Sequence, residues 1–141
     1  MRLAIHVQID PQMVRLVRKM GRLVSEEAGL DEMDAMAVEV SMGEALSNAL
    51  VHAYAGNSGP VAVEIVRERG TLVVEVRDSG ELQYPPGPSE PGRGLYLIKR
   101  LMDGVEVTHP TDEGRGTRVR MLKRISSRGT PESFRRITPT T

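Results

Sequence analysis

Three polar residues recur at steps of four along one stretch of the sequence: Glu44, Asn48 and His52. If this stretch is helical, each step advances ~400°, so the three side chains point the same way. Glutamate can act as a base, the asparagine oxygen suits Mg²⁺, and histidine can donate to a phosphate. The spacing predicts a face that binds phosphate and metal, while the solvated side of an amphipathic helix would show the same trio.

A second group is Asp78-Ser79-Gly80, which follows an alternating apolar stretch. A carboxylate at a strand end can accept a hydrogen bond from an exocyclic amine such as that of adenine. A nearby glycine lets the backbone approach a flat ring. The alternative is an ordinary Asp-x-Gly turn.

Two glycine-rich segments complete the candidate chemistry. Gly92-Arg93-Gly94 stands directly before a predicted helix, where backbone N–H groups, the helix N-terminus and Arg93 could surround an anion. It completes neither a Walker A sequence nor a Gly-x-Gly-x-x-Gly fingerprint, and a plain junction between loop and helix is the alternative. The second segment, residues 114–117, is typical of a hairpin turn that leads into a strand.

Hydrophobic periodicity predicts the elements that position these groups. Alternating apolar residues predict strands over residues 3–9, 61–66, 72–76, 105–108 and 117–122. Helical spacing predicts helices from residue 11 to before Gly29, from 31 to about 54, and over 95–102, with Asp10 and Asp31 as N-caps. The prolines between residues 80 and 92 predict a loop. This order predicts an α+β fold, with helices on one face of a mixed, largely antiparallel sheet.

The composition narrows the class of protein. The chain has 141 residues, enough for one domain with a core. Nineteen basic residues balance nineteen acidic ones, which disfavours direct nucleic-acid binding. The chain has no cysteine, which excludes thiol chemistry, and the sequence shows no leader and no long apolar run, so we expect a cytoplasmic protein without a membrane partner. We expect the domain to span residues 1–124 and residues 125–141 to form a disordered tail.

Taken in order, the motifs resemble a known superfamily. Glu44-x-x-x-Asn48-x-x-x-His52, Asp78-x-Gly80, Gly92-x-Gly94-Leu95 and Gly116-Thr117 look like the N, G1, G2 and G3 boxes of the gyrase, histidine-kinase and MutL ATPases. The strings over residues 43–54 and 92–103 are most similar to the anti-sigma-factor serine kinases. The resemblance covers roughly residues 3–123. It departs from the family at Leu82, where a second glycine is common, and at residues 89–91, where a basic residue is common.

The resemblance implies a Bergerat fold, a two-layer α/β sandwich that binds ATP between the long helix and a lid over residues 80–91. It implies that Glu44 is the catalytic base and Asn48 the Mg²⁺ ligand. The remaining residues implied to bind nucleotide are His52, Gly92, Arg93, Gly94 and Leu95 at the phosphates, and Asp78, Gly80 and Thr117 at the adenine.

The implied function is an ATP- and Mg²⁺-dependent serine kinase that phosphorylates an anti-sigma-antagonist protein of the STAS type and regulates a sigma factor. A homodimer is also implied, because members of this family commonly dimerise. Two other functions fit the same boxes: an ATP-gated binding module that transfers no phosphate, and the catalytic half of a split histidine kinase.

Overall fold

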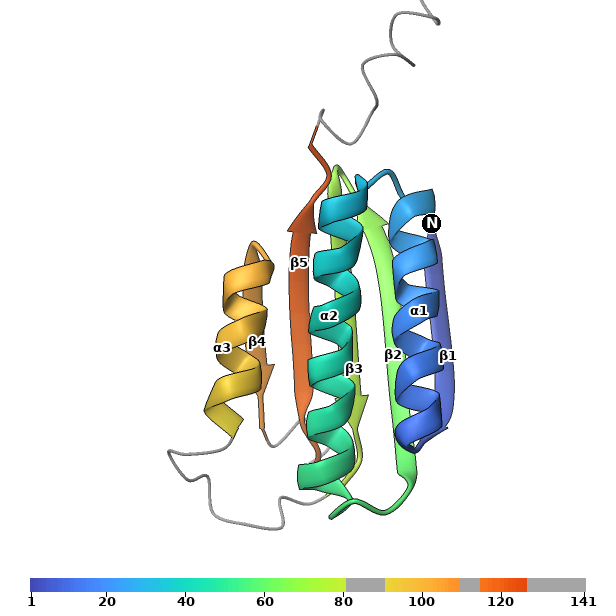
Figure 1. Cartoon of the computed structure of the whole chain (residues 1–141), viewed down its shortest axis with the longest axis vertical. Helices are drawn as coiled ribbons and strands as arrows, with labels where there is room; N and C mark the ends of the chain where they lie inside the picture. The colour runs from blue at the N-terminus through green and yellow to red at the C-terminus, as the bar shows by residue number, and fades with distance from the viewer. Residues whose placement is uncertain (81–90, 110–114, 127–141) are drawn as a thin grey trace, which may run out of the picture.

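The computed structural model describes residues 1–80, 91–109 and 115–126. The chain forms one sheet and one layer of helices (Figure 1). The strands are β1 (Arg2–Ile9), β2 (Gly59–Glu68), β3 (Thr71–Asp78), β4 (Gly104–Thr108) and β5 (Arg118–Arg124). The helices are α1 (Pro11–Glu27), α2 (Glu32–Asn48), the π-helix η1 (Ala49–Ala53) and α3 (Pro91–Leu101).

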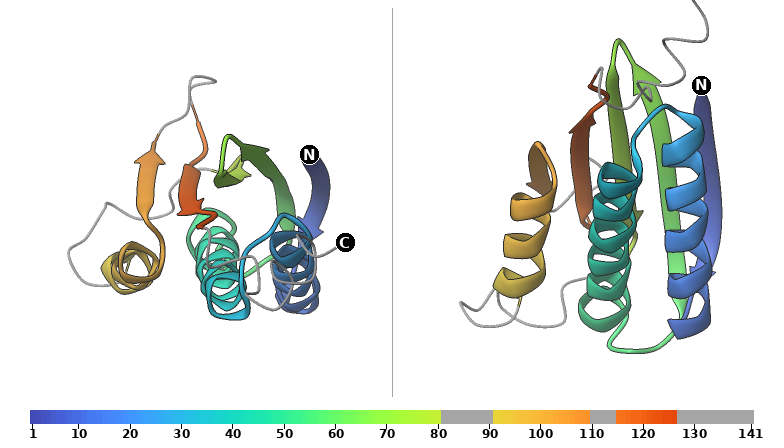
Figure 2. Two further views of the ribbon diagram at one scale, coloured as in Figure 1. Left: turned by 90° about the horizontal axis from the view of Figure 1, so that it is seen from above. Right: turned by 45° about the horizontal axis from the view of Figure 1, so that its top comes forward.

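The five strands lie in the order β1-β2-β3-β5-β4, so the last strand of the chain is inserted between β3 and β4. All four pairings are antiparallel, which makes the sheet antiparallel rather than mixed. Figure 2 shows α1, α2 and α3 on the same face of this sheet. The α+β fold and the placement of the helices on one face are therefore confirmed.

The core lies between the sheet and the helices. Alternate residues of the central strands point toward α2 and are almost fully buried, as Val63 (2% exposed) and Val74 (0%) show. Val38, Met42 and Leu46 of α2 are 0% exposed and face them. Period 2 in the strands and a 3.6-residue period in α2 thus place two apolar surfaces against each other.

The predicted helix starts and the hairpin are confirmed. The Asp10 carboxylate accepts a hydrogen bond from the N–H of Met13 at 2.7 Å, and the Asp31 carboxylate accepts one from the N–H of Asp34 at 2.8 Å. Each satisfies a backbone donor that the first turn of a helix leaves unpaired. Arg69 and Gly70 form the turn between β2 and β3, both with positive φ, as two-residue hairpin loops of the primed type require.

Three boundaries differ from those predicted. The regular α-helix ends at Asn48 and continues as η1, so the predicted helix over 31–54 has two parts. Helix α3 begins at Pro91, which places Gly92, Arg93 and Gly94 in its first turn rather than before it. Ile125, placed at the start of the predicted tail, donates its N–H to the carbonyl of Gly70 at 2.7 Å and packs against the core.

Two further predictions concern parts of the chain that are not described. Most of the predicted loop over 80–92, with Leu82 and Glu90, lies outside the described residues, as does the predicted tail from residue 127. Within the described part of the chain, no helix is long and apolar enough to cross a membrane.

Candidate functional site

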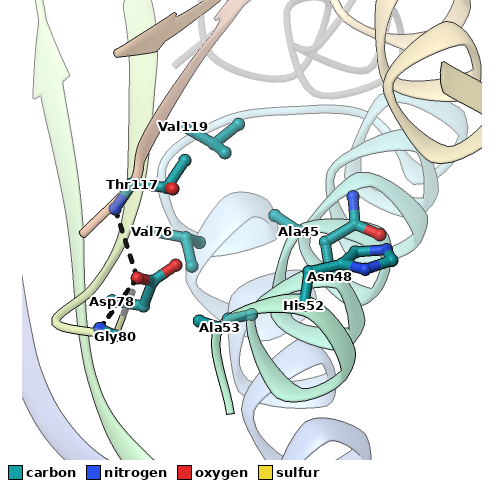
Figure 3. A pocket seen from close by; sticks show the side chains of 10 residues that line it. Ala45, Asn48, His52, Ala53, Val76, Asp78, Gly80, Thr117 and Val119 are labelled. Carbon is teal, nitrogen blue, oxygen red and sulfur yellow. Dashed lines mark hydrogen bonds between the residues drawn. The ribbon is translucent and has the colours of Figure 1, made fainter. Parts of the chain in front are cut away.

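A pocket lies where α2 passes into η1, opposite the ends of β3 and β5 (Figure 3). The helical wall carries Asn48 and His52, and the strand wall carries Asp78, Gly80 and Thr117. Alanines and valines line the rest: Ala45, Ala49, Ala53, Val76 and Val119. The walled part encloses about 50 Å³, larger than the ~10–15 Å³ that one water needs. It is an apolar hollow with a few polar groups, the composition typical of small-molecule sites.

Among the described residues, Asp78 is the one carboxylate in the wall of this pocket, and it is only 7% exposed. Its Oδ1 accepts hydrogen bonds from the backbone N–H of Gly80 at 3.1 Å and of Thr117 at 3.2 Å. Figure 3 shows the other carboxylate oxygen directed into the pocket. One oxygen therefore fixes the side chain, and the second faces the hollow as an acceptor.

Burial raises the pKa of Asp78, because removing a carboxylate from water disfavours its charged form. The N–H groups of Thr117 and Gly80 and the nearby His109 act in the opposite direction but do not cancel this effect. A buried carboxylate with a displaced pKa in a concave site is a typical feature of functional sites.

Two glycines allow the walls of the pocket to approach each other. A Cβ on Gly80 would lie 2.5 Å from the carbonyl oxygen of Ala53 in η1. Gly116 has φ +86°, and a Cβ there would lie 2.3 Å from the carbonyl oxygen of Asp78. Both obstructing atoms belong to the backbone, so they cannot move aside as a side-chain end could. Gly80 approaches η1 closely, and the predicted approach of its backbone to a bound ring stays a prediction.

Sequence reasoning missed two residues that organise the strand wall. The Tyr54 hydroxyl donates to the carbonyl of Pro60 and accepts from the N–H of Ser79 at 2.9 Å, so it joins the start of β2 to the end of β3. His109 Nδ1 lies 2.7 Å from the carbonyl oxygen of Gly116 and 3.0 Å from the Thr117 hydroxyl. Neither residue belongs to the four spaced motifs, and each contact forms only where the chain folds back on itself, so no residue pattern identified them.

The predicted trio on the long helix is only partly in the pocket. Asn48 and His52 line it, although His52 lies in the π-helix rather than on a regular α-helix. Single π-helical turns of this kind occur frequently at functional sites. Glu44 is half-buried one turn before Asn48 and does not line the pocket.

The third motif, residues 92–95, lies at the end of the molecule that also holds the pocket. Figure 1 shows α3 beginning at the end where α2 and β3 finish. Gly92, Arg93, Gly94 and Leu95 are the second to fifth residues of α3, and the backbone N–H groups of Gly92 and Arg93 lack intrahelical partners there. The sheet order and the helix layer therefore bring all four motifs to one end of the fold.

The described residues contain no group of three or more His, Asp or Glu side chains that could hold a metal ion. Asn48 supplies one amide oxygen, a ligand that fits Mg²⁺. A divalent ion here would need most of its ligands from water or from a bound phosphate group. The donor set therefore fits a Mg²⁺ ion that arrives with a polyphosphate.

The model of the histidine kinase-like ATPase domain matches residues 7–123, which include every element from β2 to α3 and all four motifs. The chain belongs to the histidine kinase-like ATPase family. The superfamily predicted from the motifs is therefore confirmed.

Curated relatives within this ATPase family are anti-sigma factors. The anti-sigma F factor of Clostridium acetobutylicum is 30% identical over 109 residues, which cover 69% of this chain and 73% of that protein. The anti-sigma F factor of Bacillus thuringiensis is 28% identical over 103 residues, covering 64% of this chain and 69% of that protein. These similarities confirm the resemblance to anti-sigma-factor kinases and place the ATPase domain of this chain among anti-sigma-type regulators.

Proposed function

We propose that this protein binds ATP with Mg²⁺ and transfers the terminal phosphate to a serine of a partner protein. One observation supports nucleotide binding above all others: Asp78 holds one oxygen in place and directs the other into an apolar hollow that faces Asn48 and His52. An adenine ring has a flat apolar body and an exocyclic amine, so it matches this combination.

The placement of polar groups in the pocket supports an orientation for the nucleotide. Its polar groups are divided between two walls: Asp78, Gly80 and Thr117 lie on the strand wall, and Asn48 and His52 lie on the helical wall. The base edge would meet Asp78, with Gly80 and Thr117 beside it. The phosphates would then extend past Asn48 and His52 toward the first turn of α3, where the unpaired N–H groups of Gly92 and Arg93 favour an anion.

Asn48 would hold the Mg²⁺ ion through its amide oxygen, with phosphate oxygens and waters as the other ligands. When bound, the ion neutralises negative charge on the phosphates, which is the main requirement of phosphoryl transfer. Glu44 lies one helical turn from Asn48 and outside the hollow. There it could accept the proton of an incoming serine hydroxyl as a general base.

The relatives support the identity of the partners. Because the curated relatives are named anti-sigma F factors, we propose that this protein regulates a sigma factor. We propose an anti-sigma-antagonist of the STAS type as the protein that receives the phosphate, since the motifs are most similar to the kinases that act on such antagonists.

The Glu44→Gln variant tests this function. We expect it to keep ATP-dependent protection from thermal unfolding, with and without Mg²⁺, because it retains the pocket. We expect transfer of labelled phosphate to candidate antagonists to fall by ~10²–10⁴-fold, the usual contribution of a general base. Glu32→Gln, in the first turn of the same helix, is the control and should retain the wild-type rate.

Two results would change the proposal. Transfer at the wild-type rate by Glu44→Gln would exclude Glu44 as the base. Strong ATP-dependent binding of partners by the wild-type protein, without transfer to any antagonist, would select the ATP-gated binding module instead.

A further inference from the structure

The side chain of Tyr54 connects the two walls of the pocket. Tyr54 follows η1 directly, so its backbone continues the helical wall that carries His52. Its hydroxyl reaches the strand wall, where it accepts a hydrogen bond from the N–H of Ser79 at 2.9 Å. Ser79 stands between Asp78 and Gly80, which both line the pocket. Tyr54 thus spans from one wall to the other without lining the hollow itself.

The Tyr54 hydroxyl takes the place of one hydrogen bond between β2 and β3. The last pair of this ladder is Val61 with Asp78, so the next pair in the same register is Pro60 with Ser79. Asp78 directs its N–H away from β2, to the carbonyl of the residue before β5, at 3.0 Å. Since N–H groups alternate along a strand, that of Ser79 is directed toward Pro60. The hydroxyl stands between these two groups, because it accepts from Ser79 and donates to the carbonyl of Pro60.

The inserted hydroxyl separates the two strands where the pocket begins. A direct hydrogen bond would place the Ser79 nitrogen ~2.7–3.2 Å from the Pro60 oxygen. Here each of these atoms is bonded instead to the oxygen of Tyr54. The end of β3 is therefore held further from β2 than a continuous ladder would hold it. Asp78 and Gly80, on either side of Ser79, take their positions from this end.

The ring of Tyr54 has a fixed position as well. A Cβ added to Gly59 would lie 2.4 Å from Cγ and from Cδ1 of the ring, so the ring packs directly against this glycine. Gly59 is buried at the start of β2. Burial raises the pKa of the Tyr54 hydroxyl, so it keeps the proton that it donates to Pro60. The ring and the hydroxyl are thus both held by the backbone of β2.

We infer that Tyr54 is a positioning residue for recognition of the base. Its hydroxyl sets the place of the Asp78 carboxylate, which accepts the adenine amine in the proposed complex, so the inference rests on the proposed function. Tyr54 acts through Asp78 rather than through a contact of its own with the ligand. Its contribution is therefore to the preference for a base that carries the amine, and not to the binding of the phosphates.

Tyr54→Phe tests this role, because it removes the hydroxyl and keeps the ring. The N–H of Ser79 can then bond directly to Pro60, which would draw Asp78 toward β2. The probes are ATP and purine riboside triphosphate, which has the same phosphates and lacks the exocyclic amine. Calorimetric titration with Mg²⁺ gives both affinities. We expect the wild-type protein to prefer ATP by ~10-fold or more, the usual contribution of a hydrogen bond to a charged group, and Tyr54→Phe to prefer it by less than ~3-fold.

Tyr96→Phe is the matched control. Tyr96 is 61% exposed, and its hydroxyl accepts from Arg100 of the same helix at 3.1 Å. Loss of this hydroxyl should leave the preference for ATP at the wild-type level. A general loss of stability is also separable, since it would lower the affinities for the two nucleotides equally and leave their ratio unchanged. Thermal unfolding without nucleotide measures the stability of each variant.

Gly59→Ala provides a second, independent variant. It keeps the Tyr54 hydroxyl but forces the ring away from β2, because the new Cβ would overlap the ring. We expect it to lower the preference for ATP as Tyr54→Phe does. It decides the question alone where Tyr54→Phe fails to fold.

The possible outcomes separate this inference from the proposed function. Loss of the preference in Tyr54→Phe and Gly59→Ala, with Tyr96→Phe unchanged, supports the inference. A folded Tyr54→Phe variant that keeps the wild-type preference overturns it and leaves the proposed function intact. A wild-type protein that binds both nucleotides equally overturns the contact between Asp78 and the amine, and the inference with it.

Discussion

At the scale of single residues, Asp78 shows how the fold prepares an acceptor. Backbone N–H groups from two segments, at Gly80 and Thr117, hold one oxygen, and the other faces the pocket. The carboxylate is also largely buried, so it faces a ligand in surroundings where each hydrogen bond is stronger than in water. In the proposed complex, recognition of the adenine amine would therefore depend on a single atom.

The Asp78→Asn variant tests that dependence. An asparagine oxygen can still accept from Gly80 and Thr117, but an NH₂ group then faces the pocket and cannot accept from an amine. We expect the affinity for ATP to fall by about 10-fold to 100-fold, because a hydrogen bond to a charged group contributes ~1.5–3 kcal/mol. Calorimetric titration measures it. Asp103→Asn, whose carboxylate also accepts a backbone N–H, is the control and should bind normally.

The raised pKa of Asp78 gives a prediction for pH dependence. The folded protein binds this proton more tightly than the unfolded chain does, so the stability that Asp78 contributes is full below its ordinary pKa of 3.8. That contribution is lost as the pH rises through the folded pKa. The free energy of unfolding of Asp78→Asn, measured relative to wild type, should therefore increase from pH 3.8 toward neutrality. A difference that is constant with pH would contradict the raised pKa.

At the scale of elements, the pocket depends on segments that only glycine can form. Gly116 precedes Thr117 with a positive φ, and its Cα packs against the backbone of Asp78. Gly80 approaches the backbone of η1 in the same way. The end of β3 is thus enclosed between the start of β5 and the π-helix, and its position sets that of the carboxylate.

Replacing two glycines by alanine separates backbone strain from crowding. Gly70 has φ +79° and open space around it, so Gly70→Ala should cost ~1–2 kcal/mol of stability from the left-handed conformation alone. Gly116→Ala has the same strain and also a contact with the carbonyl of Asp78, which should add ~1–3 kcal/mol. Urea unfolding measures both. Equal losses would show that the packing at Gly116 is looser than described.

The sequence predicted most elements because their signals are local. Alternation in β2 and β3 and the caps at Asp10 and Asp31 each depend on a few neighbouring residues. The π-helix was not predictable, since four-residue spacing is compatible with a continuous α-helix through His52. The start of α3 at Pro91 was also missed, because the glycines after it usually indicate a loop.

At the scale of the whole molecule, the site residues were predictable as a set but their arrangement was not. Asn48, His52, Asp78, Gly80 and Thr117 were identified from their order in the sequence, and they line one pocket. The order of the strands follows from long-range pairing, such as that of Val76 with Val119, which no local pattern encodes. Tyr54 bonds to the start of β2 and the residue after β3, and His109 contacts the two residues before β5, so only the folded arrangement reveals their roles.

The end of the structured unit can be tested by shortening the chain. We propose that a chain ending after Ser126 keeps wild-type stability, because the core cluster of the described residues ends at Met121, with Ile125 the only later residue of that part of the chain packed against it. A chain ending after Arg124 loses the half-buried Ile125 and its hydrogen bond to Gly70. It should lose about 1–2 kcal/mol, since full burial of an isoleucine contributes ~1.5–3 kcal/mol. Thermal unfolding of both chains measures this, and equal melting temperatures would place the boundary before Ile125.

The insertion of β5 between β3 and β4 has a consequence for synthesis. A ribosome releases the chain from its N-terminus, so β1, β2 and β3 can pair while the remainder is still being made. Strand β4 then has no neighbour until β5 emerges, and Asp78 lacks the N–H of Thr117 until the same moment. A nascent chain therefore lacks the complete wall around Asp78 until β5 has been made, and among the described strands β5 is the one that completes both the sheet and the pocket.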